Sequence, residues 1–428
     1  MIVILWFGKH FVPLQECILS SFMRSSLRYI LAVIAVFGAF HLSMNAQNAT
    51  SSPYSMFGYG ELNDNVPGAY RGMGGVTTGM RSKTVINPSQ PASYSSIDNT
   101  TFMFDLAASA MWSNYRDASG QRNKGNGNLE YLTMQFPLWK YIGFSLGIMP
   151  YSAVGYDIKD SVTNVLHPYK KNYVGSGGIS EVYAGISFNI MDWVALGMNV
   201  YYMFGDLENH KSLSFTESGF NTVSQVSTMH VSDVRLRYGA QFFHTFAEKH
   251  TVVLGATFEN RSKLNGKFSK IETTTADTVQ ISPSGFELPM SWSVGASYNY
   301  AGRMTFAADY SVVNWANTLY FGNRGTFRDR SKLALGFEYR HDPNGRKYVE
   351  RMPFRIGCSM SDSYLKNVGA KEFSVSLGVG FPLRNVATVI NTIVEYGHRG
   401  TRGTLEENYL KFTINASVSE NWFFKRRL

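Results

Sequence analysis

The sequence has few cysteines and few charged residues. Its 428 residues include only two cysteines, Cys17 and Cys358. Cys17 falls in an N-terminal leader, so the mature chain keeps one cysteine and can form no intramolecular disulfide. Charged residues make up 17% of the chain, below the roughly 25% of an average soluble domain. These shortages exclude a disulfide-stapled module and argue against a soluble enzyme, which would carry more charge and visible helical periodicity.

Long apolar runs are also missing. Beyond residue 46, no segment approaches the ~18 uninterrupted apolar residues of a membrane-spanning helix. Aromatic residues nevertheless make up 14% of the chain. Apolar residues spread over every second position, with many aromatics, are typical of a membrane β-barrel. The formal net charge is +9, but the basic residues are scattered, so we expect them to solvate loops and lumen and predict no nucleic-acid partner.

The N-terminus has the features of a targeting signal. Arg24 and Arg28 precede the apolar run 29–42. A small-residue cleavage site follows, so we expect a leader over 1–46 with the signal peptide at about 23–46. Two start sites stay open, Met1 with an extended leader and Met23 at the beginning of the signal.

The spacing of the gaps between amphipathic segments carries the most information. Long gaps fall near 114–128, 155–177, 206–230, 262–284 and 314–328, and short gaps alternate with them. Short turns on one side and long loops on the other are typical of an outer-membrane barrel. The pattern therefore predicts an even number of antiparallel strands in up-and-down order. We predict fourteen: 101–113, 129–138, 141–154, 178–190, 193–205, 231–246, 251–261, 285–300, 303–313, 329–341, 353–362, 371–381, 385–396 and 406–424.

Each predicted strand has one apolar and one polar face. Near 234–242 the apolar face carries Val234, Leu236 and Tyr238, and the opposite face carries Arg235, Arg237 and Gly239. Successive side chains of a strand point to opposite faces. A soluble barrel with an apolar interior shows the same alternation, but the sorted gaps and the signal peptide favour lipid outside and a polar lumen. The fold class is thus all-β, a 14-stranded antiparallel transmembrane β-barrel over residues 100–428.

Residues 47–99 lack any clean period and are rich in Gly, Pro, Ser and Asn. Fourteen strands enclose a lumen too wide for wall side chains alone to fill. We therefore predict that this segment is a hatch, or plug, in the lumen. Aromatic residues near strand ends are predicted to form interfacial girdles. They are Trp112, Tyr115, Trp139, Tyr141, Trp193, Tyr201, Tyr202, Trp315, Tyr320, Trp422 and Phe423.

The charged residues of the polar face allow two interpretations. In the first, Arg235, Arg237 or Arg355 contacts an anionic head group inside the lumen. In the second, charges of both signs form ion pairs that tie the hatch to the wall. The turn 342–352 is longer than its neighbours; it either contacts something in the periplasm or is simply a longer turn.

No pattern of a catalytic site appears. The nine histidines show no metal-ligand spacing, and the chain has no Gly-x-Ser-x-Gly elbow. The glycines of RGMGG are not followed by the Lys-Ser/Thr of a phosphate loop. We predict that the protein is not an enzyme, with no cofactor, no metal site and no catalytic residues.

The hatch carries the motifs of a resemblance. Gly72, Gly74 and Gly75 lie in RGMGG, and an Asn-Pro element follows with Asn87, Pro88 and Pro91. Together with fourteen strands, these motifs resemble the FadL/TodX family of outer-membrane transport proteins in a divergent, Bacteroidetes-type form. The residues Ser89 and Gln90 interrupt the family's Asn-Pro-Ala motif.

The resemblance also implies a lateral gate. In the family the third barrel strand is kinked and opens a gap in the wall. Here Gly143, Gly147 and Pro150 lie in the third predicted strand, where a proline interrupts the ladder.

Two functions follow from the resemblance. The first is a channel for uptake of hydrophobic small molecules, of the long-chain fatty acid or hydrocarbon type, with lateral exit near strand three. The second is a FadL-like barrel that does not transport and serves as a subunit of a larger outer-membrane assembly or secretion complex. The expected location is the bacterial outer membrane. Expected partners are the lipid bilayer and lipopolysaccharide, a hydrophobic ligand, lipid or detergent molecule, and, for the second function, other outer-membrane proteins.

Overall fold

The computed structural model describes residues 50–421 except 119, 164, 216, 218, 274–277, 282–284, 367–370, 384–387 and 402–403. The leader 1–46, the start sites, Trp422 and Phe423 lie outside the described residues. Among the described residues, the structure has no helix of the length and apolarity that crossing a membrane requires.

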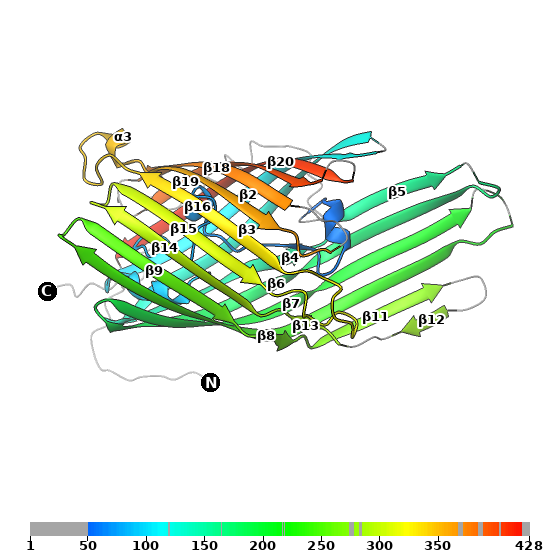
Figure 1. Ribbon diagram of the computed structural model, residues 1–428, viewed down its shortest axis with the longest axis horizontal. Coiled ribbons are helices and arrows are strands. Elements are labelled where there is room, and N and C mark those ends of the chain that lie inside the picture. Colours follow the sequence, from blue (N-terminus) through cyan, green and yellow to red (C-terminus); the bar gives the residue numbers. More distant parts are fainter. Residues whose placement is uncertain are drawn as a thin grey trace, which may run out of the picture. The chain divides into compact units, whose positions relative to one another are not determined.

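Fourteen antiparallel strands close into a barrel (Figure 1), as predicted. Closure comes from the first and last strands, which pair from Thr101 with Asn421 to Arg116 with Glu406. The strands are β2 (Thr101–Asp117), β3 (Gly120–Trp139), β4 (Ile142–Ala153), β6 (Tyr169–Met191), β7 (Val194–Phe215), β8 (Val223–Phe246), β9 (His250–Glu259), β14 (Ser291–Tyr300), β15 (Met304–Val313), β16 (Arg330–Tyr339), β17 (Phe354–Asp362), β18 (Lys371–Pro382), β19 (Val389–Gly400) and β20 (Glu406–Asn421).

The two ends of the barrel differ. At the end that we call the turn rim, strands join through short turns such as 140–141 and 192–193. The turn between β16 and β17 is longer and holds helix α3 (Tyr348–Arg351). The opposite end, the loop rim, carries the longer connections.

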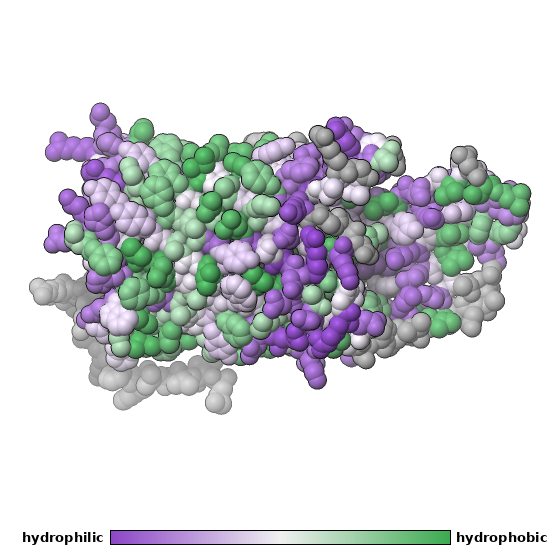
Figure 2. Space-filling model, viewed as in Figure 1, coloured by the Kyte–Doolittle hydropathy of each residue, from purple (hydrophilic) through white to green (hydrophobic). Residues whose placement is uncertain are grey.

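Side chains alternate between the outside and the lumen. On β8, Val234 is 50% exposed whereas the next residue, Arg235, is 7% exposed. On the face seen in Figure 2, apolar side chains form a broad band across the barrel, with hydrophilic side chains on both sides of it. A closed sheet satisfies its backbone hydrogen bonds within itself, which a lipid environment requires.

Four predicted long loops, 114–128, 155–177, 206–230 and 262–284, are wrong, because strands occupy most of each of them. β2 and β3 leave only 118–119 between them, β7 continues to Phe215, and β8 begins at Val223. Beyond the apolar band both faces of a sheet meet water, so the apolar alternation that marks a lipid-facing strand is not needed there. Periodicity in the sequence therefore stops where the lipid-facing surface stops, while the hydrogen-bonded ladder continues.

The extended strands form a sheet that projects from the loop rim, which we call the blade (Figure 1). It consists of the outer ends of β6, β7 and β8 together with β5 (Tyr156–Val162), β11 (Gly266–Thr273) and β12 (Thr278–Ile281). β5 pairs with β6, and β11 pairs with β8.

Residues 50–99 lie inside the barrel, and we call them the inner segment. Their regular pieces are short: the 3-10 helix η1 (Pro53–Met56), β1 (Glu61–Leu62), helix α2 (Gly68–Arg71) and the 3-10 helix η2 (Pro91–Ser96). Helix α2 packs on β18, β19 and β20, and η2 packs on β4, β6, β7 and β8. A short two-stranded sheet of β10 (Ser262–Lys263) and β13 (Glu287–Leu288) lies in the connection between β9 and β14.

The wall has a seam between β3 and β4. Their pairing ends at Leu132 and Ile148, although both strands continue toward the loop rim. Past this point β3 pairs only with β2, and β4 pairs with β1 of the inner segment through Ser152 and Ala153. The inner segment thus replaces β3 as the neighbour of β4.

Candidate functional site: the lumen and its inner segment

A row of glycines on the lumen face brings the inner segment into backbone contact with the wall. A Cβ atom added to any of these glycines would collide with the inner segment. At Gly336 the collision is with the carbonyl oxygen of Met73, and at Gly357 it is with the backbone of Gly74. The other glycines are Gly143, Gly197, Gly239, Gly255 and Gly295. Seven strands therefore each contribute a position without a side chain at the same contact, and we call these residues the glycine row.

The residues of the glycine row lie side by side across the wall. Gly197 pairs with Gly239, Gly255 with Gly295, and Gly336 with Gly357. Such close approach of two backbones is a known use of glycine. The inner segment consequently follows the wall from β17 round to β4.

Polar contacts fix the inner segment at the same level. The Asp309 carboxylate accepts hydrogen bonds from the backbone N–H groups of Thr77, Thr78 and Gly79, the second at 2.6 Å and the third at 3.2 Å. The Pro88 carbonyl accepts from Asn199 Nδ2 at 2.8 Å and from the Tyr201 hydroxyl at 2.9 Å. Both wall residues are fully buried. A buried polar group that loses its partner costs about 1–3 kcal/mol.

Near the turn rim, Arg81 connects its own part of the inner segment with η2. Its guanidinium donates to the Ala92 carbonyl at 2.8 Å and to Asn189 Oδ1 at 3.0 Å, and it lies 4.1 Å from the centre of the Phe243 ring. These partners are neutral, so burial lowers the pKa of Arg81 to about 10. The side chain still carries its charge at neutral pH.

An apolar cluster closes the loop rim. Trp315 is 1% exposed and contacts Tyr59 of the inner segment, with ring centres 5.6 Å apart. Phe327 and Tyr364 pack on the same rings. The prediction that Trp315 belongs to an interfacial girdle is therefore wrong, because it sits in a loop that folds over the lumen. The same prediction is wrong for Tyr115 and Tyr201, which are 6% and 0% exposed. We call this the outer cluster; it consists of Tyr59, Val154, Tyr156, Ile179, Met203, Leu207, Met229, Val231, Leu264, Phe286, Leu288, Trp315, Phe327, Tyr364 and Leu365.

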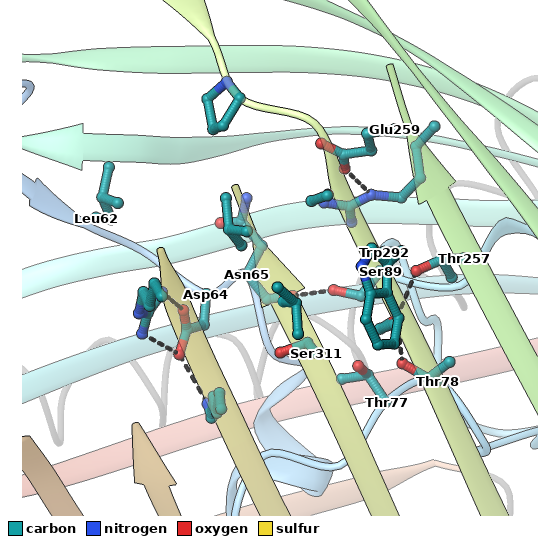
Figure 3. A pocket seen from close by; sticks show the side chains of 18 of the residues that line it. Leu62, Asp64, Asn65, Thr77, Thr78, Ser89, Thr257, Glu259, Trp292 and Ser311 are labelled. Carbon is teal, nitrogen blue, oxygen red and sulfur yellow. Dashed lines mark hydrogen bonds and ion pairs between the residues drawn. The ribbon is translucent and has the colours of Figure 1, made fainter. Parts of the chain in front are cut away.

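Two cavities beneath the outer cluster have charged walls. The smaller, about 180 Å³, is bounded by Asp64 and Asn65 of the inner segment and by Glu259 and Trp292 of the wall (Figure 3). The larger, about 440 Å³, reaches from β16–β20 to the seam between β3 and β4. Its charged side chains are five acidic and five basic: Glu61, Asp64, Glu130, Glu372, Glu395, Arg71, Arg330, Lys332, Arg399 and Lys411.

Every one of these ten charges has an opposite partner. Arg71 contacts Glu130 at 3.1 Å and Glu395 at 3.7 Å. Arg399 contacts Glu61 at 2.8 Å and Glu372 at 3.2 Å. Lys411 pairs with Glu130 at 2.7 Å. The cavity also has apolar side chains such as Leu62, Val66 and Met111 in its wall. An apolar solute here would still displace water from the ion pairs, so the larger cavity is a poor site for it.

Asp64 ties the inner segment to β16. Its carboxylate lies 2.7 Å from both Arg330 and Lys332 (Figure 3). Burial favours the neutral acid, but the two cations outweigh it and hold the pKa of Asp64 well below its usual range. A carboxyl with a lowered folded-state pKa stabilises the fold at neutral pH and loses that contribution as pH falls.

We expect the stabilising contribution of Asp64 to be lost only at pH values below the usual pKa range of aspartate. The contribution of Asp64 to the urea midpoint in detergent should stay constant between pH 8 and 5 and decrease only as pH falls below ~4. Asp64→Asn should lower the midpoint at neutral pH and remove its share of the acid dependence. The matched control is Asp98→Asn, because Asp98 forms an ion pair with Lys83 at the surface, where the Asp98 side chain is 59% exposed. An unchanged midpoint in Asp64→Asn would contradict the expectation.

The structure gathers the predicted hatch motif along the glycine row. Gly74 and Gly75 have φ values of +71° and +85°, a region that glycine adopts without strain. Asn87 donates to the Thr77 carbonyl at 2.8 Å. Pro91 begins η2 and contacts Gly239, and Gly72 approaches Gly378 of β18.

The residues predicted for a lateral gate lie on β4. Pro150 is at the seam, and Gly143 and Gly147 lie between the seam and the turn rim. The register between β4 and β6 shifts between Pro150 and Ser152, directly after the end of the β3–β4 pairing. Gly147 faces the neighbouring strand β3, and Gly143 belongs to the glycine row under η2. Pro150 lines the larger cavity where it reaches the seam.

The three predicted anion-contacting arginines all bind side chains of the wall. Arg235 lies 2.7 Å from both Glu181 and Glu259. Arg237 pairs with Glu259. Arg355 lies 2.6 Å from Glu338 and donates to Asn391 at 2.7 Å. Among the described residues, no group of three His, Cys, Asp or Glu side chains has the arrangement of a metal site.

Sequence reasoning placed Asp309 on the lumen face by parity, but it missed the glycine row and the contact of Asp309 with the inner segment. A signal was present, because many predicted strands carry a glycine on the polar face, as Gly239 does next to Arg237. What the sequence did not supply was the height of each glycine along the barrel. That height depends on strand register, which the pairing of neighbouring strands sets.

An apolar groove of about 640 Å³ lies elsewhere, on the outward face of β14–β18. Its exposed walls include Tyr298, Phe306, Leu335 and Ile356. These side chains belong to the apolar band and do not open into the lumen.

Comparisons with known proteins agree on the fold. The CymD monoaromatic hydrocarbon channel superposes with a TM-score of 0.56 at 12% identity, covering 84% of this chain and 98% of the other. The Ralstonia pickettii toluene transporter TbuX gives 0.56 at 13%, covering 82% and 97%. A Pseudomonas aeruginosa FadL homologue gives 0.56 at 12%, covering 85% and 99%. At such identities the likeness shows the fold alone.

Sequence comparison gives a different family. A family model described as BamG matches residues 27–428. None of the curated proteins matches the sequence.

Proposed function

Because the chain belongs to the BamG family, and because its lumen is filled from within, we propose that it is a FadL-like barrel that does not transport. It works as a subunit of an outer-membrane protein complex. The proposal corresponds to the second function that the sequence resemblance implies. The single observation that supports this proposal is the packing of the inner segment. Its backbone lies on the glycine row, with no space for a solute between them.

The outer cluster supports the same proposal. A channel for hydrophobic compounds needs an apolar pocket that is open at the loop rim. In this chain the apolar side chains at that rim pack on one another and on Tyr59, which is fully buried. The space that is left below them is lined by neutralised ion pairs. A barrel built in this way presents surfaces to partners and does not offer a path to solutes.

The test is extraction of the protein from its own membrane in mild detergent, followed by native mass spectrometry. The expected result is a stoichiometric complex with other outer-membrane proteins and no adduct of fatty-acid or hydrocarbon mass. In proteoliposomes, the purified barrel should not raise the flux of toluene or of a long-chain fatty acid above that of protein-free vesicles. A lone barrel that carries such adducts and raises the flux would contradict the proposal.

One observation favours transport as a second candidate. The larger cavity reaches the seam between β3 and β4, where Pro150 and Ser152 line it. If solutes leave the lumen through this seam, Pro150→Ala should reduce flux by restoring a backbone donor to β4. The same variant should leave complex formation unchanged, so the two candidates separate in one experiment.

A further inference from the structure

The edge strand of the blade is unpaired along its length. β4 and β5 follow one another along the side of the sheet that faces away from β6. On that side, β4 pairs with β3 as far as Ile148 and with β1 at Ser152 and Ala153. From Tyr156 to Val162, β5 pairs only with β6 among the described residues. Alternate residues of this seven-residue strand therefore direct their N–H and C=O groups to the side where no described strand is paired, and η1 of the inner segment packs beside β5. Such an edge is a template for pairing with another extended chain.

The same edge already pairs with a strand that is not part of the barrel wall. β1 adds to β4 in antiparallel register, Glu61 with Ala153 and Leu62 with Ser152. The Asn63 N–H donates to the Tyr151 carbonyl at 2.9 Å and continues this contact. This contact runs away from β5. At the other end of β1, Glu61 is paired with Ala153, three residues before β5 begins at Tyr156.

β5 lacks two of the devices that usually protect an edge. It contains no proline, and its register with β6 runs without a bulge from Tyr156 with Gly175 to Val162 with Tyr169. Its charged residues, Asp157, Lys159 and Asp160, are of both signs. Charges on an edge discourage indiscriminate pairing, and mixed signs leave the edge open to a segment of complementary charge.

An exposed apolar patch lies at the end of this edge. Leu166, in the turn that follows β5, is 87% exposed, and Phe220 in the next turn along the rim is 45% exposed. The His167 and Phe220 rings are 4.7 Å apart, so the two turns adjoin. Phe215 extends the patch, 4.8 Å from Phe220. The blade projects away from the apolar band, so lipid does not cover these side chains (Figure 2). Contiguous exposed apolar side chains of this kind mark interaction sites.

We propose that an extended segment of a partner protein adds to the free edge of β5 as an extra strand. The backbone of the segment pairs with β5, and its apolar side chains pack on Leu166 and Phe220. Strand addition of this kind takes affinity from main-chain hydrogen bonds and specificity from side-chain contacts. This inference rests on the proposed function and names the surface through which the complex is held. The competing occupant is the chain's own segment before Thr50.

Hydrogen exchange on the intact complex tests the inference. In a strand, alternate N–H groups point to opposite neighbours, so alternate amides of β5 should exchange at least tenfold more slowly in the complex than in the isolated full chain. Leu166→Ser with Phe220→Ser should weaken the complex at least tenfold. A matched control is Val226→Ser, which changes an apolar residue within the blade away from the edge, and which should leave affinity unchanged.

Proline substitutions at two adjacent positions sharpen the test. Of Ile158→Pro and Lys159→Pro, one removes an N–H that faces β6 and should loosen the blade. The other removes an N–H that faces the free edge and should abolish partner binding while the exchange pattern of β6 stays unchanged. The inference would be overturned if both variants lost partner binding equally and the exchange pattern of β6 changed in both.

Three results overturn strand addition, and they differ in what they say of the proposed function. An intact complex without slowed β5 amides removes this inference and leaves the proposed function standing. Alternate amides that are already slow in the isolated full chain, and that become fast when residues before Thr50 are deleted, identify the chain's own segment as the occupant. The absence of any complex removes both.

Discussion

Gly357→Ala is expected to prevent the inner segment from seating in the barrel. A Cβ atom at Gly357 would overlap the backbone of Met73 and Gly74. Neither backbone can move freely, because the Gly74 N–H donates to Ser376 at 3.0 Å and Gly74 itself approaches the backbone of Cys358 and Leu335. Overpacking of a tight contact costs typically 1–3 kcal/mol and sometimes more, and with backbone on both sides we expect about 3 kcal/mol or more. The urea midpoint in detergent should fall accordingly, and trypsin should cut at Arg71 and Arg81.

Gly125→Ala is the matched control for this prediction. Gly125 is also a glycine of a barrel strand, but an added Cβ would meet only the Trp112 ring at 3.5 Å, an ordinary contact. This variant should unfold at the wild-type urea concentration and keep the inner segment protected. If Gly357→Ala behaves like Gly125→Ala, the contact between the inner segment and the wall is looser than a solute-excluding plug requires, and transport becomes the better proposal.

The glycine row also shows what the sequence can and cannot reveal about this fold. Alternation on strands such as β8 predicted the count of fourteen and the facing of Val234 and Arg235, because lipid on one side and a polar lumen on the other impose period two. It mislocated the ends of β3, β6, β7 and β8, since the parts of these strands beyond the apolar band have water on both faces and no such constraint.

Contacts inside the lumen were beyond reach for a different reason. The inner segment has no periodicity, and its position depends on which wall residues stand at equal height. Asp309, for example, is one of many lumen-facing carboxylates, and only its closeness to Thr77 and Thr78 distinguishes it. Trp315 was expected at a lipid interface from its type and its position near a predicted strand end, whereas tertiary packing in the loop brings it onto Tyr59.

Arg235→Met is expected to destabilise the barrel by about 3–5 kcal/mol, the usual cost of removing one member of a buried ion pair. Arg235 is 7% exposed and donates to Glu181 from Nε at 3.2 Å and from an Nη atom at 2.7 Å. Glu181 is fully buried, and its other oxygen accepts from Asn65 of the inner segment at 2.7 Å. Without the guanidinium, Glu181 becomes an uncompensated charge in a dry site, so both wall and inner segment should loosen. Urea unfolding in detergent measures the change.

The double variant Arg235→Met/Glu181→Gln isolates the charge effect. It removes one charge of each sign and leaves the pair of Arg237 and Glu259 in place. Replacing a buried ion pair by neutral groups of similar size is often nearly neutral, so the double variant should recover most of the lost stability, and its coupling energy gives the strength of the pair. If Arg235→Met is as stable as the wild type, the pair is accessible to water, and Arg235 is then free to contact an anionic head group. The same cycle therefore decides between the two interpretations of the lumen arginines, a network that fixes the inner segment or a site for a bound anion.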